Sequence, residues 1–295
     1  MLAELLQLVF NGIYAGSAYA LLGGAFGLLL GCTRVIRFEL AGIYAIGAYA
    51  ALGCISFGGL PQIVASVLGV FVAVSVGVLG QLLVFRPMQR RSASTLTQLI
   101  AALGIYTVLQ NTISITAGDE IRRLGPWLGE KGFWVYGAHV TWFQLMTVCV
   151  FGSLLGGLAA LLRFTSWGKQ IRAVSSDADL ALCIGVATDR VILVAVALAS
   201  GLCGAGAVLT GMDTGLMPAM GFRPMVMGII AAIVGGVGSL RGAVVGGLGL
   251  GLVMHLGVWR ISAHWQDAIA FLVLLAFLLV KPQGMFGRPL ARATV

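Results

Sequence analysis

The chain has 295 residues, of which 59% are hydrophobic and only 9% are charged, and its formal net charge is +8. A soluble domain carries roughly 25% charged residues, so this composition excludes an ordinary soluble enzyme or binding domain. The basic residues lie in short links between apolar runs, as the positive-inside rule of membrane proteins expects, and not in a polar segment with interleaved aromatics, which excludes nucleic-acid binding.

Apolar runs follow one another along the chain and predict an all-α integral membrane protein, with residues 1–295 as one transmembrane domain. A membrane helix needs about 20 apolar residues. The runs 39–57, 224–237 and 243–257 are short or rich in glycine and are therefore candidates for re-entrant or broken helices. We expect about 8–9 transmembrane or re-entrant helices, from the runs 5–31, 39–57, 61–85, 96–116, 140–162, 191–212, 224–237, 243–257 and 266–280.

The links between the runs predict the orientation, because links rich in Lys and Arg stay in the cytoplasm. Such residues gather in alternate links and after the last run, whereas the 117–139 link has balanced charges. We therefore expect the N-terminus outside and the C-terminus in the cytoplasm. The basic residues are Arg86, Arg90 and Arg91, then Arg163, Lys169, Arg172 and Arg190, and finally Lys281 and Arg288.

The longest polar stretch, 163–190, is cytoplasmic in this orientation. It is longer than a simple connection usually is, and Ser176 or Asp177 is suitable as the N-cap of a short helix within it. An ordinary loop is the alternative interpretation. The length favours an element with a task of its own.

Pairs of glycines four residues apart recur in the apolar runs. Such pairs let helix backbones approach closely in lipid, so we expect helix-packing faces, with a pore-lining role as the alternative. The pairs are Gly12/Gly16, Gly23/Gly27, Gly152/Gly156, Gly242/Gly246 and Gly247/Gly251.

Signatures of catalysis and nucleotide binding are missing from the sequence. It contains no G-x4-G-K-[ST] phosphate loop, no metal-spaced His/Cys cluster and no nucleophile elbow. Ionisable residues that would mark an ion pathway are scarce, since Glu39, Asp213 and Asp267 stand at predicted ends of runs, where the interface or a helix dipole accommodates them. We expect no catalytic residue, no bound cofactor or metal, and an energy source outside this chain.

Four segments carry motifs in the order of one family. Residues 11–22 read NGIYAGSAYALL, residues 235–247 read GGVGSLRGAVVGG, and residues 266–288 end in KPQGMFGR. Between them, a cytoplasmic G-x3-R-A…D-x3-A-x3-G-[IV] pattern is matched by Gly168, Arg172, Ala173, Asp177, Ala181, Gly185 and Val186. Together these segments resemble the LivH-like permeases of bacterial branched-chain amino acid ABC importers.

The resemblance implies a multi-pass protein of the bacterial inner (plasma) membrane, surrounded by lipid, that imports branched-chain or related amino acids by alternating access. In such importers two permease subunits, identical or related, form the path. Two separate ATPase subunits bind ATP-Mg, and a periplasmic binding protein delivers the substrate.

By the same resemblance, the 163–190 stretch is the loop that couples the permease to the ATPase. Its implied residues are Gly168, Arg172, Asp177, Ala181 and Gly185. Arg172 and Asp177 would contact the ATPase, and the two glycines would mark the ends of the element.

One segment departs from the family pattern. In RVIRFELAGIYAIGAY, residues 34–49, Arg37 and Leu40 stand where the family has Asn and His, and Glu39 replaces a small residue. Two positions apart, Arg37 and Glu39 would not face each other on a helix. We expect these charges to meet another subunit, or a carboxylate or amine of the substrate, which questions branched-chain specificity. With Asn11 and Asp213, they are the candidates for the translocation path.

Two other classes of function are alternatives. A stand-alone channel or secondary carrier for a small polar solute, such as urea, an amide or an organic acid, would need its own gate or coupling ions. A membrane-embedded enzyme would need a nucleophile or metal set that the sequence does not offer. Co-purification of an ATPase separates the importer from the channel.

Overall fold

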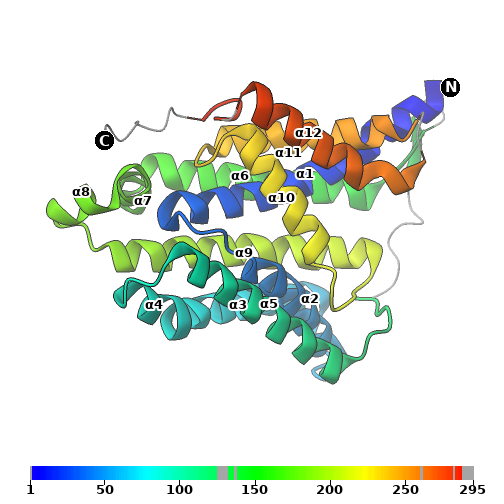
Figure 1. Cartoon of the computed structure of the whole chain (residues 1–295). Coiled ribbons are helices and arrows are strands. Elements are labelled where there is room, and N and C mark those ends of the chain that lie inside the picture. Colours follow the sequence, from blue (N-terminus) through cyan, green and yellow to red (C-terminus); the bar gives the residue numbers. More distant parts are fainter. Residues whose placement is uncertain (1, 125–131, 136–137, 260–261, 282, 288–295) are drawn as a thin grey trace.

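The computed structural model describes residues 2–124, 132–135, 138–259, 262–281 and 283–287, and most of them form long helices lying side by side (Figure 1). The helices Phe222–Gly235 and Gln266–Val280 are apolar but short. Seven helical stretches in the described ranges are long and apolar enough to cross a membrane, which confirms an all-α membrane protein: Ala3–Thr33, Glu39–Ser56, Gln62–Arg90, Thr95–Ala117, Trp142–Phe164, Thr188–Thr214 and Leu240–Gly257.

The elements follow the predicted apolar runs closely. In chain order they are α1 (Leu2–Thr33), α2 (Glu39–Ser56), α3 (Gln62–Gly80), the π-helix η1 (Gln81–Phe85), α4 (Arg86–Arg90), α5 (Thr95–Ala117), β1 (Gly132–Val135), β2 (Ala138–Thr141), α6 (Trp142–Phe164), α7 (Ser166–Ser176), α8 (Ala178–Cys183), α9 (Thr188–Thr214), α10 (Phe222–Gly235), α11 (Leu240–Gly257), the short 3-10 helix η3 (Ala263–Trp265) and α12 (Gln266–Val280).

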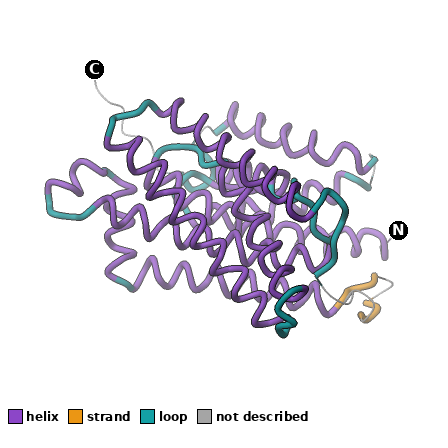
Figure 2. Tube along the Cα trace, turned by 90° about the horizontal axis from the view of Figure 1, so that it is seen from below, coloured by secondary structure: helices purple, strands orange, loops and turns teal. Residues whose placement is uncertain are grey.

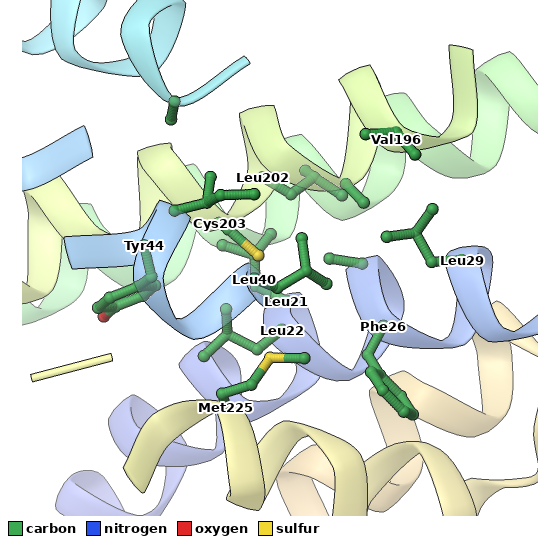
Figure 3. Close-up of a cluster of buried hydrophobic side chains, with 14 of the residues drawn as sticks. Leu21, Leu22, Phe26, Leu29, Leu40, Tyr44, Val196, Leu202, Cys203 and Met225 are labelled. Carbon is green, nitrogen blue, oxygen red and sulfur yellow. The ribbon is translucent and has the colours of Figure 1, made fainter. Parts of the chain in front are cut away.

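Helix α1 lies at the centre of the bundle and packs against α9, α10 and α11. Its side chains Leu21, Leu22 and Phe26 point into a core that α2, α9 and α10 complete (Figure 3). Helices α3, α5 and α6 keep much of their apolar surface exposed. In a membrane this surface faces lipid or another subunit, so the described chain has a buried centre and an apolar periphery.

The glycine pairs of α1 and α11 are packing faces, as the sequence predicts. A Cβ atom at Gly251 would collide with the backbone at Gly12 and Gly16, and one at Gly247 would collide with Ala20. The pair Gly242/Gly246 lies in the same way against the backbone of α10, where Gly23 also makes close contact. The α6 pair differs, since Gly152 and Gly156 have open space around their Cα atoms within the described chain.

The two ends of the bundle carry different small elements (Figures 1 and 2). At one end, strands β1 and β2 pair antiparallel, with Gly132 opposite Thr141, and lie near the N-terminus. The Gln7 side chain accepts a hydrogen bond from the His139 amide at 2.7 Å and donates one to its carbonyl at 3.1 Å, which fastens the hairpin to α1. The sequence analysis missed this hairpin. At the other end lie α7, α8 and the chain after α12.

The close approach of α1 and α11 predicts different outcomes for two glycines of one helix. Gly251→Ala places a methyl group against backbone atoms that cannot rotate away, and overpacking of this kind costs roughly 1–3 kcal/mol. Gly249→Ala, with no neighbour within 4 Å, is the matched control and is expected to be neutral or slightly stabilising. Thermal unfolding of the purified variants in detergent measures the difference, and equal melting temperatures would contradict it.

Candidate functional site

The 163–190 stretch forms two short helices whose starts are set by capping side chains. Thr165 accepts a hydrogen bond from the Gly168 amide at 3.1 Å and so caps α7. Asp177 accepts from the amides of Asp179 and Leu180, each at 3.0 Å, and caps α8, which confirms Asp177 and not Ser176 as the N-cap. The stretch therefore forms two capped helices and is not an ordinary loop.

Helix α7 packs one face onto the end of α6. Gly168, Ile171 and Val174 recur at a spacing of three and are buried, and Gly168 lies directly against the carbonyl groups of Leu161 and Leu162. Arg172, on the exposed side, donates a hydrogen bond to the Leu162 carbonyl. Ile171 and Val174 belong to the main hydrophobic core, and α7 contacts α1 and α9 as well as α6.

Helix α8 continues the element and ends in a glycine turn. Ala181 is buried and belongs to the same hydrophobic core as Ile171. Gly185 follows the helix with φ of 86°, a left-handed conformation that glycine adopts without strain. The candidates Arg172, Asp177, Ala181 and Gly185 thus all have defined positions in the element.

A second set of contacts joins α7 to the central helix α1. The Arg34 guanidinium donates to the Ser176 carbonyl at 3.3 Å. The Ser175 hydroxyl lies so close to Gly31 that a Cβ atom there would be 2.7 Å from it, and the same Cβ atom would be 3.8 Å from Gly238 Cα. The α7–α8 element is therefore attached to α1 and to the loop between α10 and α11.

The two family-like motifs at 235–247 and 266–288 meet at this end of the molecule. The Met285 amide donates to the Val234 carbonyl and the Phe286 amide to the Gly235 carbonyl, each at 2.9 Å. These bonds use carbonyl groups at the end of α10 that have no partner within the helix. Pro282 and Arg288 of the second motif lie outside the described residues.

Helix α8 also carries exposed aliphatic side chains, which the sequence analysis did not single out. Leu180, Leu182 and Ile184 are 63%, 61% and 70% exposed, and α8 projects beyond the ends of the long helices (Figure 1). Leu180 and Ile184 are four residues apart and share one side of the element, whereas Leu182 points to another side. Exposed apolar side chains on a projecting element are candidates for a contact surface. The sequence signal was the apolar segment LALCI, residues 180–184, within the 163–190 stretch.

The prediction that Arg37 and Glu39 cannot face each other is wrong. Arg37 precedes α2 and is not on it, so its side chain reaches Glu39 Oε1 at 2.8 Å from Nη1. The two side chains are 1% and 6% exposed, so they also do not stand at an interface as the sequence analysis expected. Within the described residues the two charges therefore meet each other.

The π-helix η1 supplies the other partners of Arg37. The Arg37 Nη2 donates to Gln81 Oε1, at the start of η1. The Arg37 guanidinium carbon lies 3.6 Å from the centre of the Phe85 ring, at the end of η1, so both ends of η1 contact the Arg37 side chain. Burial lowers the pKa of the guanidinium and Glu39 raises it again; an arginine in a protein stays charged regardless. Gln81, which follows eighteen residues without another amide, a charge or a histidine after Gln62, was the sequence signal for this contact.

The other path candidates lie toward the hairpin end. Asn11 is half-buried on α1 and accepts a hydrogen bond from Gln7 at 3.2 Å. Asp213 is half-buried near the end of α9 and interacts electrostatically with the Tyr14 hydroxyl, one turn along α1 from Asn11. The four path candidates therefore fall into two separate places, Arg37 with Glu39 and Asn11 with Asp213.

Known proteins resemble this chain over almost its whole length. The family model for the permease component of branched-chain amino acid transport systems matches residues 8–278. The high-affinity branched-chain amino acid transport system permease protein LivH of Escherichia coli K12 is 31% identical, over 96% of both chains. The corresponding BraD protein of Pseudomonas aeruginosa is 28% identical over the same share of each chain.

A solved structure supports the fold. The chain matches PsaBC from Streptococcus pneumoniae, determined in complex with Fab, with a TM-score of 0.54, at 14% identity and over 96% of this chain and 97% of that one. At this identity the likeness concerns the arrangement of helices alone.

The buried pair predicts a non-additive response to substitution. Arg37→Met leaves a buried carboxylate unpaired, and Glu39→Leu leaves a buried guanidinium without its counter-charge, so each is expected to cost roughly 3–5 kcal/mol. The double variant removes both charges and should be more stable than either single variant. Apparent melting temperatures in detergent test this cycle, and costs that simply add would show that the pair is not coupled.

Proposed function

This chain belongs to the family of branched-chain amino acid transport system permease components, and from that membership we propose that it is the membrane-spanning subunit of an ATP-driven importer of branched-chain or related amino acids. The observation that carries the proposal beyond the family is the α7–α8 element, capped, packed onto α1 and α6, and tipped with exposed aliphatic side chains. A channel that works alone has no use for such an element.

In this proposal the end with α7, α8 and the chain after α12 faces the cytoplasm, and the N-terminus and hairpin face the periplasm across the inner membrane. The arginines of the Gln62–Arg90 span end and of the α7–α9 region support this orientation, because cytoplasmic ends collect basic residues. The chain acts as one transmembrane domain, residues 1–295, with the coupling element within 163–190.

The proposed partners supply the energy, the second half of the transport path and the delivery of the substrate. Two ATPase subunits bind and hydrolyse ATP-Mg, a second permease subunit completes the path, and a periplasmic binding protein delivers the amino acid. The permease itself performs no covalent chemistry. It exchanges outward and inward openings when the ATPase subunits close and reopen.

The aliphatic surface formed by Leu180, Leu182 and Ile184 is the proposed contact with the ATPase. Fully burying one such side chain contributes about 1.5–3 kcal/mol, so three of them can supply a substantial part of the binding free energy between permease and ATPase. Arg172 and Asp177 remain in the proposed contact, although both also hold the element itself together, Arg172 at Leu162 and Asp177 as the cap of α8. Replacing them would therefore disturb the element as well as the contact.

The attachment of α7 explains how a push on α8 would reach the transport path. The Arg34–Ser176 bond and the close approach of Ser175 to Gly31 join the element to the end of α1. Because α1 packs against α6, α9, α10 and α11, a displacement of α7 would reach these four helices through α1.

A secondary carrier is not favoured. Ion coupling needs a buried ionisable group that can change its charge or its partner. Among the described residues, the buried charged side chains are Arg37 and Glu39, and they neutralise each other.

The proposal predicts that an altered α8 surface uncouples transport. The double variant Leu180→Asp with Ile184→Asp should lower the amount of ATPase subunit that stays bound in a detergent pull-down by at least about tenfold. Losing the burial of two aliphatic side chains costs more than about 1.4 kcal/mol of binding free energy, which is a tenfold change in affinity. Uptake of radiolabelled leucine into proteoliposomes with internal ATP should fall to background. Met217→Asp, an exposed apolar residue toward the other end of the bundle, is the matched control and should change neither result.

Two outcomes would overturn parts of the proposal. Normal ATPase recovery with the double aspartate variant would remove the α8 surface from the contact while leaving the importer in place. Leucine uptake by this chain alone, without ATPase or ATP, would replace the importer with a channel or carrier.

A further inference from the structure

A small cavity lies between η1 and the start of α9, near the end of the bundle that carries α7 and α8. Its volume is about 60 Å³, several times the roughly 10–15 Å³ that a cavity needs by this measure to hold one water molecule. It is lined by Gln81, Leu82, Arg86, Asp189, Arg190 and Leu193. No step of the proposed transport mechanism uses it.

The rim of the cavity carries an excess of positive charge. Asp189 accepts from Arg86 Nε at 3.1 Å and lies 3.6 Å from Arg90. That leaves the two terminal nitrogens of Arg86 without a hydrogen bond to the described residues, and Arg190 without any ion pair to them. Helix α9 starts at this point without a side-chain cap, so its first amide groups add positive potential. The Asp189 carboxylate is thus surrounded by three arginines, Arg86, Arg90 and Arg190, and by the N-terminus of α9.

The other wall of the cavity is apolar and continues onto the outside of the bundle. Leu82 and Leu193 line it, and the neighbouring Leu79 and Leu83 are 52% and 71% exposed on the surface of α3 and η1. These residues belong to a helical stretch that is long and apolar enough to span a membrane, so their exposed surface is available to lipid acyl chains. The site therefore joins an anion-attracting rim to a lipid-facing surface at the membrane boundary.

We propose that this cavity binds the phosphate group of an anionic phospholipid, with Arg86 and Arg190 holding the phosphate oxygens and the acyl chains lying along Leu79 and Leu83. Basic pockets between spans on the cytoplasmic side suit such headgroups. The floor of the cavity is Gln81, which also binds Arg37, so a bound lipid stabilises the segment that encloses the buried ion pair. The proposal does not depend on the transported substrate.

The apolar wall distinguishes a lipid from a free phosphate ion. An inorganic phosphate would gain from the arginines alone and would compete with water at an exposed rim. A phospholipid gains from the same arginines and keeps its acyl chains in the membrane, where they are already concentrated next to the site.

The test is lipid retention by the intact purified chain. The protein is delipidated in detergent and mixed with phosphatidylglycerol or with phosphatidylcholine of the same acyl chains, and bound lipid is counted by native mass spectrometry. The unaltered protein should retain phosphatidylglycerol selectively. Arg86→Gln and Arg190→Gln should each lower its occupancy roughly fivefold, the equivalent of about 1 kcal/mol per arginine near the surface.

Two further variants separate this site from general surface charge. Arg163→Gln removes an exposed arginine at the α6 end next to α7, outside the cavity lining, and should leave retention unchanged. Asp189→Asn removes the one carboxylate of the rim and should raise retention, which keeps the proposal testable if an arginine variant fails to fold.

Three results would overturn the proposal. Equal retention of the two lipids would show that charge does not select. An equal loss with Arg163→Gln would show only a diffuse surface effect. Displacement of phosphatidylglycerol by millimolar inorganic phosphate would assign the cavity to a free anion.

Discussion

Direct backbone contact at glycine is the constraint on which this subunit depends. In lipid there is no hydrophobic driving force for two apolar helices to associate. Their attraction therefore comes from van der Waals contact, which increases as the backbones approach. At Gly12, Gly16, Gly247 and Gly251 the backbones of α1 and α11 touch without side chains between them. Helix α10 joins them through Gly228, which lies against the α1 backbone near Gly23. These three helices therefore form one body, and the α7 contacts at Gly31 and Gly238 act on that body.

The buried ion pair is a second kind of internal contact, made by charge and not by shape. It ties the break between α1 and α2 to the π-helix of the next span, and both ends of that π-helix meet one guanidinium. A π-helix shifts the register of the residues that follow it, so the basic residues at the end of the Gln62–Arg90 span are aimed by the same contact that neutralises Glu39. Gln81 thus contacts the buried Arg37 on one side and lines the cavity of Arg86, at the end of the span, on the other.

Sequence patterns predicted the parts of this fold that depend on local periodicity. The apolar runs became the long helices, Asp177 became a helix cap, and the glycine pairs of α1 and α11 became packing faces. The positions that were wrong or missed depend on tertiary contacts. Helix geometry predicted that Arg37 and Glu39 would not face each other, whereas α2 begins only at Glu39 and leaves Arg37 outside the helix. The hairpin at 132–141 and the exposed aliphatic residues of α8 follow from pairing and from missing neighbours, which no single window of sequence reveals.

The closeness of Arg37 and Glu39 along the chain has a consequence for biogenesis. A span leaves the ribosome before the spans that will enclose it, and an unpaired charge in the hydrocarbon is costly at that stage. Glu39 follows Arg37 by two residues, so the counter-charge is made within the same short segment and no later span has to supply it. Gln81 and Phe85 emerge with the third span and α9 much later. Both members of the pair are therefore present before the residues that enclose them, and the contacts of Arg37 with Gln81 and Phe85 are added afterwards.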